Sequence, residues 1–483
     1  MLDTIGEVFE GEKQLFEGLW IHDSDYEFVK HPVIKLDMSN ISNETPGIFK
    51  ISLLAALKKR VLNEKLDITD EIPSDLFKHL IEELHKKYGR GVVVLIDEYD
   101  KPILDHLGNY EIAEANRQIL KGFYGILKSM DPYLRLVFIT GVSKFTKTSI
   151  FSDLNNLLDI TLDKKYSNIC GITISEFDKY FNGYIEHLSM IDDFKHIENL
   201  RDKVLDWYDG YSWDGNTRVL NPYSLLGFFI QEKFSSYWFA SGTPKFLMDL
   251  IKNNPGVYTK LKNLEITELM LDSSDIDKIS IELMLFQTGY LTVKKVISTS
   301  RAPIFALDMP NYEIKEAFNL YIIAALTENN EVRAGQAQIE IINALQNGDM
   351  QKMRNILKSL FASIPYQLHI NREAYYHSII YAIMNILGFD IDAEVSVSNG
   401  RVDAVLILDD MVYVMEFKYK ECASDLDDAE KQEIFNNTLK EAMDQIKDRG
   451  YHVKYINSDK AVYLTAFAFL GRDDIEMEVS LIN

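Results

Sequence analysis

The 483-residue sequence lacks the features that mark secreted and membrane proteins. Its two cysteines, Cys170 and Cys422, are too few for a disulfide framework or a zinc site, which favours a reducing, cytoplasmic compartment. No apolar run is long enough to span a membrane, and the acidic start MLDTIGEVFE is unlike a signal peptide. We therefore expect a cytoplasmic protein with no membrane partner.

Basic residues are also scarce. The chain has 51 Lys and Arg against 74 Asp and Glu, a formal net charge of −23. Non-specific binding of nucleic acid normally relies on many Lys and Arg contacts to phosphate, so the net charge argues against an open binding surface of that kind. Any nucleic-acid site must be local, metal-assisted or gated. The length and the 47% hydrophobic content predict a globular protein with room for about three domains.

The most informative stretch is residues 401–418, two apolar runs rich in β-branched side chains and separated by two aspartates. Such a spacing predicts a β-hairpin with a two-residue turn. In the simplest register Val405 faces Val414, and Asp403 faces Glu416. The Cβ atoms of directly opposed residues lie roughly 5 Å apart. A slip of one residue would put the two acids on opposite faces.

This register predicts a small catalytic group. Two carboxylates so close repel each other unless one is protonated or a cation lies between them, and magnesium binds through one or two carboxylates and water. Strand alternation puts Lys418 on the face of Glu416, where it can position an attacking water. The alternative is a surface hairpin with ordinary charges. Against it, the same face carries apolar residues: Val405, Ile407, Val412 and Val414.

The G-R-x-D and E-x-K segments resemble the PD-(D/E)XK nuclease superfamily, and their surroundings are similar to the nuclease domain fused to an AAA-like ATPase. The resemblance covers roughly the last 115 residues, an ordinary domain size. It implies a restriction-endonuclease-like α/β domain at 366–483 that binds magnesium or manganese through Asp403 and Glu416 and acts on DNA, with RNA as the less favoured substrate. It also implies the order helix, three strands, helix, strand.

Two flanking helices extend the resemblance. The pattern from Asn371 to Phe389 looks like the first helix of the family, with Glu373 at its acidic position. A second helical stripe ends near Gly450 and carries Gln445, where the family has a glutamine. The resemblance implies that Glu373 and Gln445 assist in placing metal or substrate.

The first 200 residues alternate short apolar runs with helical patterns, which predicts an α/β domain with a parallel sheet. Ligands bind at the carboxyl ends of the strands in such sheets, and Asp97 and Glu98 lie at one of these ends. The expected strands are Pro32–Ser39, Gly91–Asp100 and Leu134–Gly141, with helices at 74–88 and 111–129.

The segment VVVLIDE resembles a Walker B motif, in which Asp97 would hold magnesium and Glu98 would orient water. Thr140 stands where a sensor residue is expected. A strand-terminal turn explains Asp-Glu about as well, but a longer series of segments is similar to the AAA-ATPase-like family: LFEGLWI, HPVIKLD, FITGVSKF, WYDGYSW and SGTPKFL.

The sequence departs from that family because it contains no G-x-x-x-x-G-K-[ST]. The resemblance implies that this phosphate loop and its strand would precede Met1. We expect a P-loop-like sheet that lacks its first strand, no ATP hydrolysis by this chain, and self-association through the incomplete sheet.

Residues 201–365 are expected to form a mainly helical lid or connector, with a helix at 331–346. Aromatic groups at 207–208, 213 and 237–239 are more typical of a core than of a base-stacking surface. Two functions stay open. One is a metal-dependent nuclease with an AAA-like regulatory domain at 1–200. The other is a non-catalytic switch or binding protein that senses a nucleotide or partner and uses the nuclease fold for docking.

Overall fold

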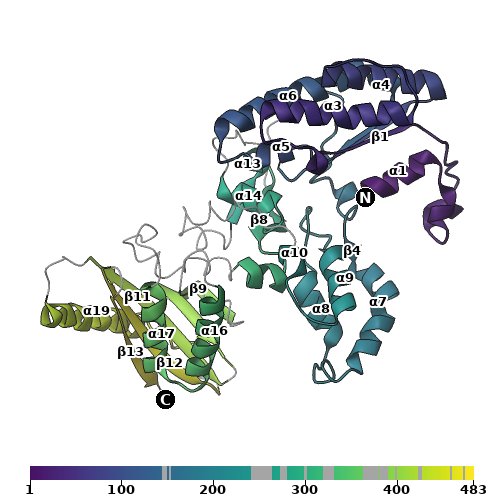
Figure 1. The fold of residues 1–483 in the computed structure, drawn as a ribbon. Helices are drawn as coiled ribbons and strands as arrows, with labels where there is room; N and C mark the ends of the chain where they lie inside the picture. The colour runs from purple at the N-terminus through teal and green to yellow at the C-terminus, as the bar shows by residue number, and fades with distance from the viewer. Residues whose placement is uncertain are drawn as a thin grey trace.

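The computed structural model describes residues 1–143, 150–151, 154–240, 264–271, 280–297, 302–318, 331–362, 380, 390–397, 400–408, 410–421, 427–456, 459–471 and 474–482. An N-terminal sheet with its helices, a middle region and a C-terminal sheet with its helices follow one another along the chain (Figure 1). Within these ranges no helix combines the length and the apolar character that crossing a membrane requires.

The N-terminal sheet is parallel, as predicted. Among the described residues its strand order is β1-β2-β3, with Asp37 opposite Asp97 at one end of the first pair. The strands are β1 Val33–Asp37, β2 Val92–Asp97 and β3 Leu134–Ile139. Helices alternate with them: α1 Leu2–Glu10, α2 Trp20–Asp23, α3 Pro46–Asn63, α4 Pro73–Tyr88, α5 Lys101–Leu104 and α6 Tyr110–Ser129.

Both faces of this sheet are covered, because alternate residues of each strand point to opposite sides. Ile34, Val94 and Ile96 pack into the core that α3, α4 and α6 share. Val93 and Leu95 pack against α1. Figure 1 shows α1 on the side of β1 opposite to α3, α4 and α6. The strand β3 forms one edge and is only partly covered.

Local signals set the ends of these helices. The Thr45 hydroxyl accepts the Ile48 N–H at 3.2 Å at the start of α3, just before a proline at the first helical position. The Asn109 side chain does the same for Ile112 in α6. The helix α4 ends at Tyr88 and is capped by Gly89, whose φ of 61° suits glycine.

The middle region contains more strand than predicted. Its helices are joined by two small antiparallel sheets, β4-β5 and β6-β8-β7. The elements are β4 Ile172–Thr173, α7 Ile174–Ser189, α8 Leu200–Tyr208, β5 Val219–Leu220, α9 Pro222–Gln231, α10 Tyr237–Ala240, β6 Leu264–Thr267, α13 Glu268–Leu271, α14 Ile281–Gln287, β7 Thr292–Ile297 and β8 Ile304–Asp308. The aromatic residues Tyr208 and Tyr237 are buried, which confirms a core role for them.

The C-terminal sheet has the order β13-β12-β11-β10-β9. The strands β11 and β12 are parallel and are joined through α19, and the other neighbouring strands are antiparallel. The last strand, β13, was not predicted. The strands are β9 Asp390–Val397, β10 Gly400–Ile407, β11 Met411–Lys420, β12 Ala461–Leu470 and β13 Asp474–Ile482. The helix α19 is Asp428–Asp448.

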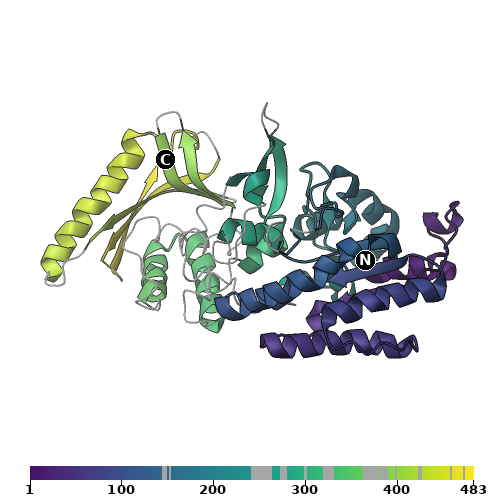
Figure 2. The ribbon, with the colours of Figure 1, turned by 90° about the horizontal axis from the view of Figure 1, so that it is seen from above.

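Helices cover both faces of this sheet (Figure 2). The long helix α19 packs on one face, and α16 (Glu331–Gln346) and α17 (Met350–Ala362) pack on the other. The Tyr413 hydroxyl of β11 donates to the Leu345 carbonyl of α16 at 3.1 Å. The predicted helix at 331–346 is therefore present but packs on the C-terminal sheet. The domain boundary at 366 stays a prediction.

The segments after β2 and β3 are packed tightly together. The buried Asp100 carboxylate accepts the Ser143 backbone N–H and hydroxyl, both at 2.5 Å. The Tyr99 hydroxyl donates to the Ser143 carbonyl at 2.8 Å. A Cβ at Gly141 would lie 2.4 Å from the Tyr99 ring and 2.6 Å from the Asp100 carboxylate, so no side chain fits there.

We predict that Gly141→Ala lowers the free energy of unfolding by about 1–3 kcal/mol, because Tyr99 or the backbone must move. The matched control is Gly122→Ala, inside α6, where an added Cβ meets nothing within 4 Å. There alanine should raise stability by about 0.5–1 kcal/mol. Urea denaturation followed by circular dichroism measures both. Equal midpoints for the two variants would contradict this account.

Candidate functional site

The predicted hairpin is formed in the predicted register. Val405 pairs with Val414, and the paired ladder between β10 and β11 runs up to Ala404 and Met415. At the next position the Asp403 carboxylate takes part in the pairing, since its Oδ2 accepts the Phe417 N–H at 2.9 Å. This bond fixes Asp403 next to the part of β11 that carries Glu416.

Glu416 is buried under α19, with 1% of its side chain exposed. Its Oε1 accepts hydrogen bonds from Lys418 Nζ at 3.1 Å and from Gln445 Nε2. Its Oε2 is buried with no hydrogen-bond partner. The site therefore holds one carboxylate oxygen by two donors and leaves the second oxygen available to a ligand.

Burial, and after it the negative charge of Asp403, raise the pKa of Glu416 to about 7. The ammonium of Lys418 opposes the rise. A carboxyl group in these surroundings gains by meeting a cation. The effect of Asp403 on Glu416 agrees with the predicted proximity of the two acids.

The helix α19 delivers Gln445 to this face. It begins with a capping box in which Asp427 and Glu430 satisfy each other's backbone N–H. Its apolar stripe consists of Phe435, Leu439, Ala442 and Ile446. This stripe packs on the even-numbered residues of β11 and β12. Gln445 lies beside this stripe and reaches Glu416. Glu373 lies outside the described residues.

The donor set fits a hard divalent cation. Asp403 and Glu416 supply carboxylate oxygens, and the oxygen of Glu416 that lacks a partner is buried at the site. Magnesium binds through one or two carboxylates together with water. Among the residues that the structure describes, no group of three or more His, Cys, Asp or Glu is placed to hold a metal ion. Water or substrate oxygens would have to complete the coordination.

The second candidate region is the carboxyl end of the N-terminal sheet. Thr140 Oγ1 donates to Asp97 Oδ1, so the end of β3 contacts the end of β2. Burial raises the pKa of Glu98, and Lys101 opposes the rise. Glu98 also has a positive φ of 48°, which is uncommon for a residue with a side chain. Asp97, Glu98 and Thr140 thus lie at one edge of the sheet, as expected.

Sequence reasoning missed Asp37 at this edge. It pairs with Asp97 in the register of β1 and β2, and its charge acts on Glu98. Its carboxylate accepts the Ser39 N–H at 2.9 Å and the Ser39 hydroxyl at 2.6 Å. The signal was available, because the apolar run before Asp37 ends in an acid just as the run before Asp97 does.

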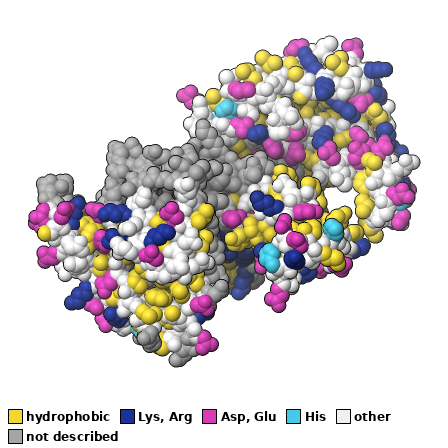
Figure 3. Space-filling model, turned by 60° about the horizontal axis from the view of Figure 1, so that its bottom comes forward, with side chains coloured by type: hydrophobic (Ala, Val, Ile, Leu, Met, Phe, Trp, Pro, Cys, Tyr) yellow, Lys and Arg dark blue, Asp and Glu magenta, His cyan; other side chains and the backbone are white. Residues whose placement is uncertain are grey.

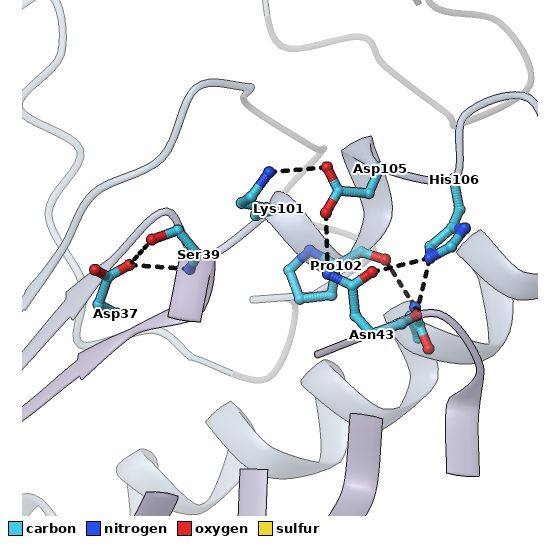
Figure 4. A network of polar contacts seen from close by, with 8 residues as sticks. Asp37, Ser39, Asn43, Lys101, Pro102, Asp105 and His106 are labelled. Atoms are coloured by element: carbon cyan, nitrogen blue, oxygen red, sulfur yellow. Dashed lines mark hydrogen bonds and ion pairs between the residues drawn. The ribbon is translucent and has the colours of Figure 1, made fainter. Parts of the chain in front are cut away.

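A polar network holds the neighbouring loops in place (Figure 4). Asp105 lies between two donors, Lys101 Nζ at 2.9 Å and Asn43 Nδ2 at 3.0 Å. His106 Nε2 lies 2.8 Å from the Asn43 carbonyl oxygen. These contacts join the loop after β1 to α5, so Lys101 is fixed near the acidic edge.

Comparisons with known proteins agree with this architecture. A family model described as "Predicted AAA-ATPase" matches residues 1–151, and one described as "PD-(D/E)XK nuclease superfamily" matches residues 371–478. A curated relative, an "Uncharacterized protein in vnfD 5'region" of Azotobacter chroococcum mcd 1, is 33% identical over 476 residues. The match covers 97% of this chain and 86% of the relative. No solved structure matches the chain.

We predict that Glu416→Gln makes the metal-free protein more stable above neutral pH. The folded-state pKa of about 7 lies above the ordinary 4.5, so the stability linked to the bound proton is complete below about 4.5 and is lost as the pH rises through 7. The loss is on the order of 3 kcal/mol at pH 8. Glutamine cannot ionise, so the variant does not lose this stability as the pH rises.

Urea denaturation in EDTA between pH 5 and 8 measures this difference. The control is Glu433→Gln, which removes an exposed carboxylate from the same helix. The gap between wild type and Glu416→Gln should widen with pH, and the gap for Glu433→Gln should not. Parallel curves for all three proteins would contradict the account of Glu416.

Proposed function

The chain belongs to the family that joins an AAA-ATPase-like domain to a C-terminal PD-(D/E)XK nuclease superfamily domain, and we propose that it is a metal-dependent nuclease that hydrolyses DNA. The observation that carries the proposal is the buried Glu416 carboxylate, which has one oxygen held by Lys418 and Gln445 and the other without a partner. A domain retained only for its shape would not need to bury a carboxylate in this way.

In this proposal Asp403 and Glu416 hold magnesium or manganese. A bound divalent ion supplies an activated water and charge stabilisation on the phosphodiester. Lys418 positions the attacking water and stabilises the developing negative charge. Gln445 fixes the orientation of Glu416, which leaves Oε2 pointing to the ligand. Glu373 is proposed to assist from its predicted helix.

The second candidate is a switch or binding protein in which the nuclease fold only docks a partner. The net charge of −23 favours it, since the chain has few cations for a long nucleic acid. On the face seen in Figure 3, Lys and Arg side chains are scattered among acidic ones. The enclosed arrangement of Asp403, Glu416 and Lys418 favours the enzyme.

We assign the N-terminal domain a regulatory role. Asp97, Glu98 and Thr140 are proposed to sense magnesium or a nucleotide at the edge of the sheet, and Asp37 adds a further carboxylate there. The partly covered edge strand β3 supports self-association as a second property of this domain. In this scheme the part of residues 201–365 that precedes α16 connects the sensor to the nuclease.

The nuclease activity is tested on single- and double-stranded DNA and on RNA, with magnesium, manganese or EDTA. We expect wild type to cleave DNA only with metal, and Glu416→Gln to lose at least ~10²-fold of the rate. Glu433→Gln should retain it. Undiminished cleavage by Glu416→Gln would assign the activity to another site or to a contaminant. Nucleic-acid binding without cleavage in every condition would favour the docking protein.

We also predict that this chain does not hydrolyse ATP measurably and binds it weakly. In P-loop enzymes the phosphate loop and its lysine hold the triphosphate on which the acidic pair acts, and the sequence has no such motif. Phosphate release and isothermal titration measure the two properties. Submicromolar ATP affinity that Asp97→Ala abolishes would show that another segment supplies the phosphate site.

A further inference from the structure

The face of β11 that carries Glu416 continues to a second lysine. Glu416, Lys418 and Lys420 are alternate residues of one strand, so they share a face. Their partners in the parallel register with β12 are Ala466, Ala468 and Leu470, which all lie in the core beneath α19. The three polar side chains therefore form one row between β11 and α19.

This row opens to solvent in one direction. The exposed fraction of the side chain is 1% for Glu416 and 15% for Lys418, and it reaches 46% for Lys420. A phosphodiester that approaches Glu416 along this row passes Lys420 before it reaches Lys418. The position of Lys420 is thus at the entrance of the site.

The Lys420 ammonium is paired with a carboxylate of the protein itself. The ammonium lies 3.0 Å from Glu441 Oε2. Glu441 precedes Gln445 by four residues on α19, so both project from the same face of the helix, one onto Lys420 and the other onto Glu416. The pair is half exposed, and such ion pairs exchange partners readily. A phosphate oxygen can take the place of the Glu441 carboxylate.

The spacing suits a nucleic acid strand. Residues two apart on a strand are separated by about 6.6 Å, which is comparable to the distance between successive phosphates. If Lys418 acts at the scissile phosphate, Lys420 reaches the adjacent one. With a net charge of −23, the chain needs such local cations to hold a polyanion.

We propose that Lys420 binds the substrate phosphate adjacent to the scissile one, and that Glu441 fills this place when no nucleic acid is bound. The inference rests on the proposed nuclease function and adds a substrate-binding residue to it. Glu441 then acts as a built-in competitor that the substrate phosphate displaces.

The test measures DNA binding across 50–200 mM salt in a Glu416→Gln background, which prevents cleavage. Lys420→Ala should weaken binding and reduce the slope of log K against log salt by about 0.9 for duplex or about 0.7 for single strands, the value of one phosphate contact. Lys420→Arg should retain affinity and slope. Glu441→Gln should tighten binding, because the competing carboxylate is gone.

The matched control is Lys358→Ala. Lys358 is 49% exposed and pairs with Asp474, but it lies on α17, across the sheet from α19. The Lys358→Ala substitution removes the same charge from the same domain and should leave the slope of log K against log salt unchanged. A purely structural Lys420–Glu441 bridge would make Glu441→Gln as weak a binder as Lys420→Ala, and would overturn the proposal.

Cleavage by the proteins that retain Glu416 separates the two hypotheses. If wild type cleaves DNA in a Glu416-dependent way and Lys420→Ala binds like Lys358→Ala, the inference on Lys420 is wrong and the nuclease function stands. If wild type neither binds nor cleaves DNA, the nuclease function itself is wrong.

Discussion

The C-terminal domain depends on one costly interaction, the burial of the Glu416 carboxylate between a sheet and a helix. A carboxylate that is removed from water loses its hydration and needs hydrogen-bond donors in the protein instead. Here Lys418 and Gln445 donate to only one of its two oxygens. The apolar packing of α19 on β11 and β12 keeps the carboxylate in place. The fold thus supplies the free energy that maintains a reactive group in an unfavourable state.

The acidic side chains of the N-terminal and C-terminal sites differ in their hydrogen-bond partners. At the N-terminal edge Asp37 and Asp97 are satisfied by hydroxyl and backbone donors, and Lys101 is held near by the Asn43 and Asp105 network. At the C-terminal site Glu416 keeps an oxygen without a partner. In the first arrangement these two aspartates accept hydrogen bonds from donors of the chain itself. The second needs a ligand, which is why the catalytic proposal is centred there.

Sequence patterns gave the parts that depend on local periodicity. The hairpin of Asp403 and Glu416 followed from two apolar runs separated by two residues, and β1, β2 and β3 followed from short apolar segments between helices. Tertiary packing decided the rest. The strands β4 and β5 have two residues each, too short for a period to show. The pattern of α16 predicts a helix but not the sheet on which it packs. Glu373 lies outside the described residues, so its role stays a prediction.

The helices α16 and α17 carry apolar side chains such as Leu345 and Leu357 that pack in one core with Phe467 and Phe469 of β12. They precede that strand by about 100 residues, which a ribosome takes roughly 5–20 s to add. For that interval the newly made helices can pack only on β9, β10 and β11, and the part of their core that β12 supplies is missing. This topology therefore leaves apolar side chains of the helical pair uncovered during synthesis until the final strands emerge.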